Sequence, residues 1–223
     1  KDYNINAIDT SYQYENEKII GKVISKQRKK FIIISKFLPL NSSPLSSIKK
    51  QFYNSLKNLK TDYLDIYFFH SGNNDEFFND DIWNFLNKQV ANGRIKSLGL
   101  SIKHQNIISN KLTQLKNASS YNIKYVSIVN NFLNSGISEK AINYCIKNNL
   151  EVIGRKPLSE GLMTGPYDKN FLNNSKNFKS TDKKFIMNAC KKIENSLNNF
   201  QKKNLTKFSI NWSLNNNKVL SNI

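Results

Sequence analysis

Several sequence features are scarce or missing in this chain of 223 residues. It has two cysteines, Cys145 and Cys190, which lie far apart, so neither a disulfide framework nor a metal cluster is expected. That cysteine usage is typical of a reduced, cytoplasmic protein. No apolar run reaches the roughly 18 residues that a membrane span needs, and no secretory leader is visible. No G-x-G-x-x-G follows the first predicted strand, which argues against an open dinucleotide-binding sheet.

Acidic residues are also scarce. The chain has 16 Asp and Glu against 34 Lys and Arg, and its net charge is +18. An excess of this size can indicate a nucleic-acid partner or an anionic membrane surface, and a steep salt dependence of heparin binding would support the former. The lysines are spread along the whole chain, however, so we interpret them as a solvated surface. We expect neither nucleic acid nor membrane as a partner.

Short β-type runs are abundant, and most are followed by a helical pattern. The predicted strands cover residues 4–9, 31–36, 62–70, 94–101, 125–131, 150–158 and 219–223. Their near-continuous apolar character is typical of a parallel sheet covered by helices, which occurs in (β/α)₈ barrels and in open doubly wound sheets. The regular repeat favours the barrel. We therefore predict an α/β fold, with residues 1–223 forming a single domain that lacks one barrel strand before residue 4.

Two predictions concern helix packing. In the first helical pattern, ENEKIIGKVISKQ, one helix face is predicted to carry Ile19, Ile20, Val23 and Ile24. Trp83 and Trp212 fall on later helical patterns. We expect both tryptophans to pack against neighbouring elements rather than to face a substrate.

Polar groups stand at the ends of three consecutive predicted strands. The first strand ends at Asp9, with Tyr14 five residues further on, the second ends at Lys36 and the third at His70. Active sites of (β/α)₈ barrels lie at the C-terminal ends of the strands. The sequence therefore predicts that a carboxylate, a phenol, an ammonium group and an imidazole meet at one rim.

Together these four groups predict a general acid directed at a carbonyl. A free phenol has a pKa of about 10, and a nearby ammonium lowers it. Lys36 would supply that ammonium to Tyr14, Asp9 would hold Lys36 charged and oriented, and His70 would hydrogen-bond a substrate oxygen. Each residue has a plainer interpretation: a helix cap, a surface lysine, a structural histidine and a packing tyrosine. Their joint arrival at one rim favours the chemical interpretation.

Four stretches, in this order, carry a family resemblance: IDTSYQYENEKIIG, SLKNLKTDYLDIYFFH, NGRIKSLGLS and VIGRKPLSEGLMTG. They resemble the signatures of the aldo-keto reductase family over essentially the whole chain. The resemblance implies a (β/α)₈ TIM barrel and NADPH-dependent reduction of an aldehyde or ketone to an alcohol. It also implies that Tyr14 is the proton donor, Lys36 its tuner, Asp9 the partner of the lysine and His70 the group that orients the carbonyl.

The resemblance further implies a nicotinamide site for NADPH, or for NADH as the alternative. The family's positions correspond here to Ser101, Ser127, Arg155, Pro157, Leu158 and Gly161. The nicotinamide site departs from the common pattern at three places. Ser101 is followed by Ile102 where the family commonly has Asn, and Ser127 stands where Gln is common. Arg155 stands where an aromatic often stacks on the nicotinamide, although some branches of the family carry Arg there.

By the same resemblance, the family's first strand would precede Lys1 and its adenosine-phosphate segment would follow Ile223. We therefore expect a fragment whose barrel is incomplete at both ends. The alternative to a reductase is a non-catalytic cofactor-binding or redox-sensing scaffold on the same barrel, as in potassium-channel β-subunits. The four strand-end groups favour catalysis, because a scaffold has no need to keep all of them. A small carbonyl compound is the expected partner.

Overall fold

The computed structural model describes residues 5–39, 44–109, 111–165, 167, 183–215 and 221–222. By its internal contacts the chain divides into two compact units. Unit 1 comprises Lys1–Ile128 and Lys140–Val152, and unit 2 comprises Val129–Glu139 and Ile153–Ile223. Among the described residues, none of the helices is both long and apolar enough to cross a bilayer.

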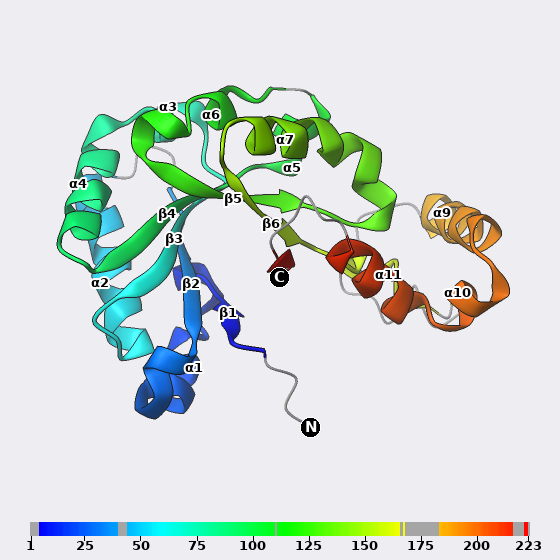
Figure 1. The fold of residues 1–223 in the computed structure, drawn as a ribbon, viewed down its shortest axis with the longest axis horizontal. Coiled ribbons are helices and arrows are strands. Elements are labelled where there is room, and N and C mark those ends of the chain that lie inside the picture. The colour runs from blue at the N-terminus through cyan, green and yellow to red at the C-terminus, as the bar shows by residue number, and fades with distance from the viewer. Residues whose placement is uncertain are drawn as a thin grey trace. The chain divides into compact units, whose positions relative to one another are not determined.

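Unit 1 alternates strands with helices (Figure 1). In chain order its elements are β1 (Ala7–Asp9), η1 (Tyr12–Tyr14), α1 (Glu17–Ile24), η2 (Ser25–Lys30), β2 (Ile32–Phe37), α2 (Leu45–Leu59), β3 (Leu64–His70), α3 (Asn74–Phe77), α4 (Asp80–Ala91), β4 (Ile95–Ser101), α5 (His104–Ile108), α6 (Thr113–Lys116), η3 (Ser119–Tyr121) and β5 (Ile123–Val129), whose last residue falls in unit 2. Helix α7 (Ser135–Lys147) and strand β6 (Glu151–Arg155) also contribute residues to both units.

Strands β1 to β5 pair in sequence order, and every pair is parallel. A doubly wound sheet reverses its strand order at a switch point, whereas a barrel keeps the order of the chain. The sequential order therefore agrees with the barrel-type arrangement for these strands. The prediction of an α/β fold is confirmed, and the five predicted strands lie within three residues of the observed ones.

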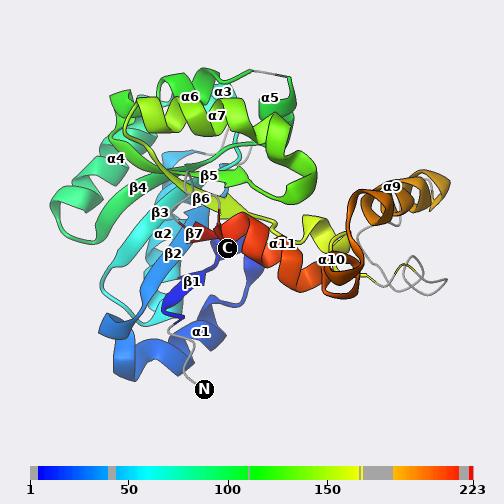
Figure 2. The same ribbon diagram turned by 45° about the vertical axis from the view of Figure 1, so that its right-hand side comes forward.

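One face of this sheet is covered by helices α2 and α4, as both views show (Figure 1 and Figure 2). Aromatic side chains of β2, β3 and α2 pack together in this layer. Tyr67 lies between Phe37 and Phe52, with ring centroids 5.4 Å away in each case, and all three side chains are fully buried. Burying a large apolar side chain stabilises the fold by roughly 1.5–3 kcal/mol. Because side chains alternate along a strand, Lys36, next to Phe37, lies on the opposite face of the sheet.

Helix α1 contacts α2 through a glycine. A Cβ atom at Gly21 would lie 2.2 Å from the carbonyl oxygen of Asn58, so no side chain fits there without a shift of the helix. This close approach turns Ile19 and Val23 away from the sheet, and they are 67% and 74% exposed. The prediction that these two residues share the packed helix face with Ile20 and Ile24 is therefore wrong. Backbone contact at the glycine, and not the apolar pattern alone, sets the rotation of α1.

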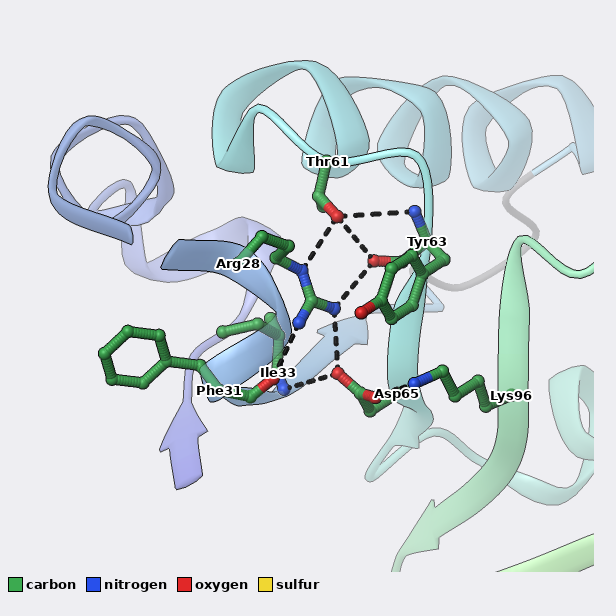
Figure 3. Close-up of polar contacts among 7 residues, drawn as sticks. All are labelled: Arg28, Phe31, Ile33, Thr61, Tyr63, Asp65 and Lys96. Atoms are coloured by element: carbon green, nitrogen blue, oxygen red, sulfur yellow. Dashed lines mark hydrogen bonds and ion pairs between the residues drawn. The ribbon is translucent and has the colours of Figure 1, made fainter. Parts of the chain in front are cut away.

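A charged network joins η2 to strand β3 near the N-terminal ends of the strands (Figure 3). The guanidinium of Arg28 donates to Asp65 Oδ2 at 2.8 Å, to Thr61 Oγ1 at 2.8 Å and to the Tyr63 carbonyl oxygen at 3.0 Å. It also lies over the Tyr63 ring, with Cζ 4.1 Å from the centroid. Arg28 thereby fixes the polar segment before β2 against the start of β3.

Asp65 is the acceptor at the centre of this network. Its carboxylate also accepts from the Ile33 amide at 2.9 Å and from Lys96 Nζ at 2.7 Å. Burial opposes ionisation of this carboxyl, but the Ile33 amide, Lys96 and Arg28 outweigh burial and lower the pKa of Asp65 below its ordinary value. The carboxylate thus connects β2, β3 and β4 at one end of the sheet.

Unit 2 contains β7 (Ser221–Asn222), η4 (Phe132–Asn134), η5 (Ser159–Gly161), α9 (Lys183–Ser196), α10 (Asn199–Lys203) and α11 (Leu205–Leu214). Strand β6 pairs parallel with β7. A small core gathers Met163, Ile193, Leu197 and Leu205. Trp212 packs edge-on against Phe132 with ring centroids 6.0 Å apart, and Trp83 of unit 1 is buried, so both tryptophans pack as predicted.

Candidate active site

The C-terminal ends of β1, β2 and β3 bring the four strand-end residues together within unit 1. Strand β1 ends at Asp9, and the short η1 that follows ends at Tyr14. In the parallel register Asp9 pairs with Ile34, so Lys36 lies two residues further toward the C-terminal end of β2. His70 is the last residue of β3. The predicted convergence at one rim is observed.

Lys36 is the buried centre of this group, with 3% of its side chain exposed. Its Nζ donates to both carboxylate oxygens of Asp9 at 2.6 Å and to the carbonyl oxygen of Thr10 at 2.8 Å. Burying an ammonium is costly unless it is paired and hydrogen-bonded, and these three oxygens offset that cost. Because an ammonium has three N–H donors, the three bonds also fix its direction.

Tyr14 and His70 lie beside this ammonium. The Tyr14 ring centroid is 5.3 Å from Lys36 Nζ and 6.0 Å from the centroid of the His70 ring, which it meets edge-on at 83°. Tyr14 is 49% exposed, whereas Lys36 is buried. A solute can therefore reach the phenol ring from one side, while the cation and its carboxylate partner lie behind it.

A buried hydrogen bond supports the site from the opposite face of the sheet. Glu17, the first residue of α1, is 1% exposed and accepts from Ser35 Oγ at 2.8 Å. Ser35 precedes Lys36 on β2, and Glu17 follows Tyr14 by three residues. The bond therefore ties the helix after the phenol to the strand that carries the ammonium. Nothing in the sequence marks Glu17 as part of the site, because a glutamate at a helix start normally indicates an exposed position.

Ser101 and Ser127, predicted to bind the cofactor, align with His70. The strand register pairs His70 with Ser101, and Ser101 with Ser127. Both serines are buried. Among the described residues, Ser127 Oγ has no hydrogen-bond partner. A buried hydroxyl of this kind is a polar group that a bound ligand could satisfy.

The other four predicted cofactor residues belong to unit 2. Arg155 ends β6, and the Pro157 carbonyl oxygen accepts from Ser209 Oγ at 2.5 Å. Leu158 and Gly161 close a turn through a 3.0 Å backbone hydrogen bond, and Gly161 has φ +102°, a conformation that favours glycine. These contacts define a tight loop after β6. The participation of this loop in the same site stays a prediction.

The family model described as "Aldo/keto reductase family" matches residues 1–223, and the chain belongs to this family. Among curated proteins, the chain is 31% identical to methylglyoxal reductase YeaE of Escherichia coli strain K12 over 100 residues, 44% of this chain and 34% of that protein. It is 32% identical to glyoxal reductase of Bacillus subtilis strain 168 over 98 residues, 43% of this chain and 34% of that protein. The matches thus span about a third of the length of these two relatives.

Solved structures agree on the fold. The holo form of aldo-keto reductase AKR11C1 from Bacillus halodurans superposes with a TM-score of 0.74 at 22% identity, covering 98% of this chain and 71% of that one. An aldo-keto reductase from Klebsiella pneumoniae, solved in complex with NADPH, superposes with a TM-score of 0.60 at 22% identity, covering 73% of this chain and 58% of that one. At these identities the likeness concerns the fold.

Proposed function

We propose that this protein is an NADPH-dependent reductase that converts a small aldehyde or ketone to an alcohol. The names of the two curated relatives point to glyoxal or methylglyoxal as the substrate class. We further propose that the sheet belongs to a single (β/α)₈ barrel domain over residues 1–223. A cytoplasmic location is part of the proposal, and it is supported by two cysteines that are buried and free.

One observation carries the proposal: Lys36 Nζ lies 2.6 Å from the Asp9 carboxylate and 5.3 Å from the Tyr14 ring centroid. A cation favours the phenolate form of a neighbouring phenol and so makes its proton easier to transfer. In the proposed reaction Tyr14 donates that proton to the carbonyl oxygen, and Asp9 keeps Lys36 in place. His70 hydrogen-bonds the same oxygen and orients the carbonyl.

NADPH, when bound, would supply the hydride, which is the chemistry of the cofactor itself. Ser101 and Ser127 would hold the nicotinamide carboxamide. The buried Ser127 hydroxyl, which lacks a partner among the described residues, fits a hydrogen-bonding amide. The family resemblance also assigns cofactor binding to Arg155 and the Pro157–Gly161 loop, and this assignment is part of the proposal. The role of the chain is to place the carbonyl carbon against the cofactor and to protonate its oxygen.

Two measurements on one pair of variants test this proposal. NADPH affinity is measured by quenching of tryptophan fluorescence, and turnover by NADPH consumption with methylglyoxal. Tyr14→Phe should lower kcat by about 10³-fold, within the range of general acid catalysis. Its NADPH affinity should stay within about twofold of wild type, less than 0.5 kcal/mol.

Tyr63→Phe is the matched control, because it removes a phenol oxygen near the opposite ends of the strands. This variant should keep wild-type turnover. Cofactor binding without turnover in the wild type would support the scaffold alternative instead of the reductase. Absence of NADPH binding would contradict both.

A further inference from the structure

A buried serine adjoins the proposed catalytic histidine and has no role in the reaction described above. Ser11 is 0% exposed and has extended backbone angles of φ −156° and ψ 149°. Its backbone position is held through its neighbour Thr10, whose amide donates to the Ile34 carbonyl at 2.8 Å and whose carbonyl accepts from Lys36 Nζ at 2.8 Å. The hydroxyl of Ser11 therefore projects from a fixed point of the backbone.

This hydroxyl lies between the Lys36 carbonyl oxygen, which can only accept, and His70 Nδ1, which accepts or donates according to the tautomer of the ring. Ser11 Oγ is 3.3 Å from the Lys36 carbonyl oxygen and 3.5 Å from His70 Nδ1. A hydroxyl has one hydrogen to donate and two lone pairs that accept. Both separations are long for hydrogen bonds, so a small rotation about the serine side chain decides which contact takes the proton.

The choice sets the tautomer of His70. If Ser11 donates its proton to the Lys36 carbonyl, its oxygen can only accept a hydrogen bond from His70 Nδ1–H. In a neutral imidazole Nε2 then carries no proton and cannot donate. If Ser11 donates to Nδ1, the proton of the neutral ring is on Nε2. A carbonyl oxygen is an acceptor, so only the second arrangement gives a neutral His70 a donor for a substrate.

We propose that Ser11 is a positioning residue that donates to His70 Nδ1 and holds the imidazole in its Nε2–H tautomer. This inference rests on the proposed function, because the need of a substrate oxygen for a donor selects between the two arrangements. The tautomer itself can be measured whether or not the protein reduces a carbonyl. No bond is made or broken at Ser11, and its hydroxyl proton stays in place.

Nitrogen-15 NMR tests the tautomer directly. The chain has two histidines, so in uniformly labelled protein every imidazole signal belongs to His70 or His104, and His104→Gln assigns them. A bare ring nitrogen and a protonated one resonate in well-separated regions. At a pH where His70 is neutral, the wild type should show a bare Nδ1 and a protonated Nε2. A protonated Nδ1 with a bare Nε2, or a doubly protonated ring that persists to alkaline pH, would overturn the proposal.

Ser11→Ala should shift the His70 signals toward the Nδ1–H tautomer and lower kcat by about fivefold, the factor that one ordinary hydrogen bond contributes. Its NADPH affinity should stay at the wild-type value. Ser11→Thr, which keeps a hydroxyl, should restore the wild-type spectrum. An unchanged tautomer in Ser11→Ala would contradict the proposal.

Ser55→Ala is the matched control, because Ser55 is also a fully buried serine and lies within helix α2. It should leave the His70 signals in place. A shift equal to that of Ser11→Ala would show that loss of core packing in general changes the tautomer, which would overturn the proposal. If the wild type shows the expected tautomer but no turnover, the reductase proposal fails while the role of Ser11 as a tautomer-setting residue stands.

Discussion

At each end of the strands of unit 1, a cation lies beside a carboxylate and a tyrosine ring. They are Arg28, Asp65 and Tyr63 near the N-terminal ends, and Lys36, Asp9 and Tyr14 at the C-terminal ends. The cation is an arginine in the first set and a lysine in the second. The tyrosine of the second set, Tyr14, is 49% exposed. Arg28 lies directly over its ring at 4.1 Å, whereas Lys36 Nζ is 5.3 Å from the Tyr14 centroid.

This difference between the two cations suits Arg28 to stabilising the fold and Lys36 to the proposed chemistry. The guanidinium directs its donors to Asp65 of β3 and to Thr61 and Tyr63 just before it, and so holds segments of backbone together, which suits a planar group with several donors in a fixed geometry. The ammonium concentrates its donors on one carboxylate and one carbonyl and leaves the phenol ring open on its other side. In α/β barrels the N-terminal ends of strands contribute stability, while the C-terminal ends carry active sites. Replacing either cation should therefore affect different properties of the molecule.

Lys36→Met should have the largest effect. Removing the ammonium deprives Tyr14 of the cation that favours its phenolate, so kcat in the proposed reduction of methylglyoxal should fall by about 10³-fold. The measurement is NADPH consumption across a range of pH. A variant whose pH profile and kcat match the wild type would show that the cation does not tune the phenol.

Arg28→Met should have the next largest effect, but on stability. It leaves Asp65 with one partner fewer in a mostly buried site, and breaking such a pair costs about 3 kcal/mol. Urea unfolding followed by circular dichroism measures the loss, and kcat should be retained. A large loss of turnover with unchanged stability would reverse the distinction between the two ends of the sheet.

The acid dependence of stability should report on Asp65. Because its folded pKa lies below its ordinary value of 3.8, the ionised carboxylate stabilises the fold above that value, and the contribution is lost as the pH falls through the folded pKa. Asp65→Asn should therefore be less stable than the wild type at neutral pH, and the difference should shrink as the pH falls below 3.8. Parallel unfolding curves from neutral to acid pH measure it. A constant difference would contradict the pKa argument.

Lys96→Met should have the smallest effect. Its side chain is 56% exposed, and an exposed ion pair contributes less than about 1 kcal/mol. The loss in stability should become smaller still in high salt, which screens surface charges. A loss equal to that of Arg28→Met would mean that Lys96 carries a structural role that its exposure does not suggest.

The sequence predicts the C-terminal ends of the strands better than the N-terminal ends, for a physical reason. Asp9, Lys36 and His70 stand at the ends of apolar runs, with Ser35 between the run and Lys36, and parallel strands bring those ends to one edge. Arg28 lies in the polar stretch SKQRKK, which has the composition of a solvated segment, and its partners are distant in the chain. Nothing in its local pattern indicates that it is mostly buried.

Helix α1 shows a second limit. Apolar periodicity predicted a packed face that includes Ile19 and Val23, but it cannot indicate that the backbone at Gly21 would approach Asn58. Ser11 and Glu17 were missed for a similar reason, since a small polar residue after a strand and an acid at a helix start are common on surfaces. Their burial depends on the meeting of β1, β2 and α1, which only the three-dimensional structure shows.

The absence of a side chain at Gly21 reaches further than helix packing. A side chain at Gly21 would force α1 away from α2. The first turn of α1 follows shortly after η1, the segment that carries Tyr14. A methyl group at the buried Gly21 would thus displace α1 and, with it, the phenol of Tyr14. Harmful substitutions in this protein should accordingly extend to a glycine in the outer layer that no substrate approaches.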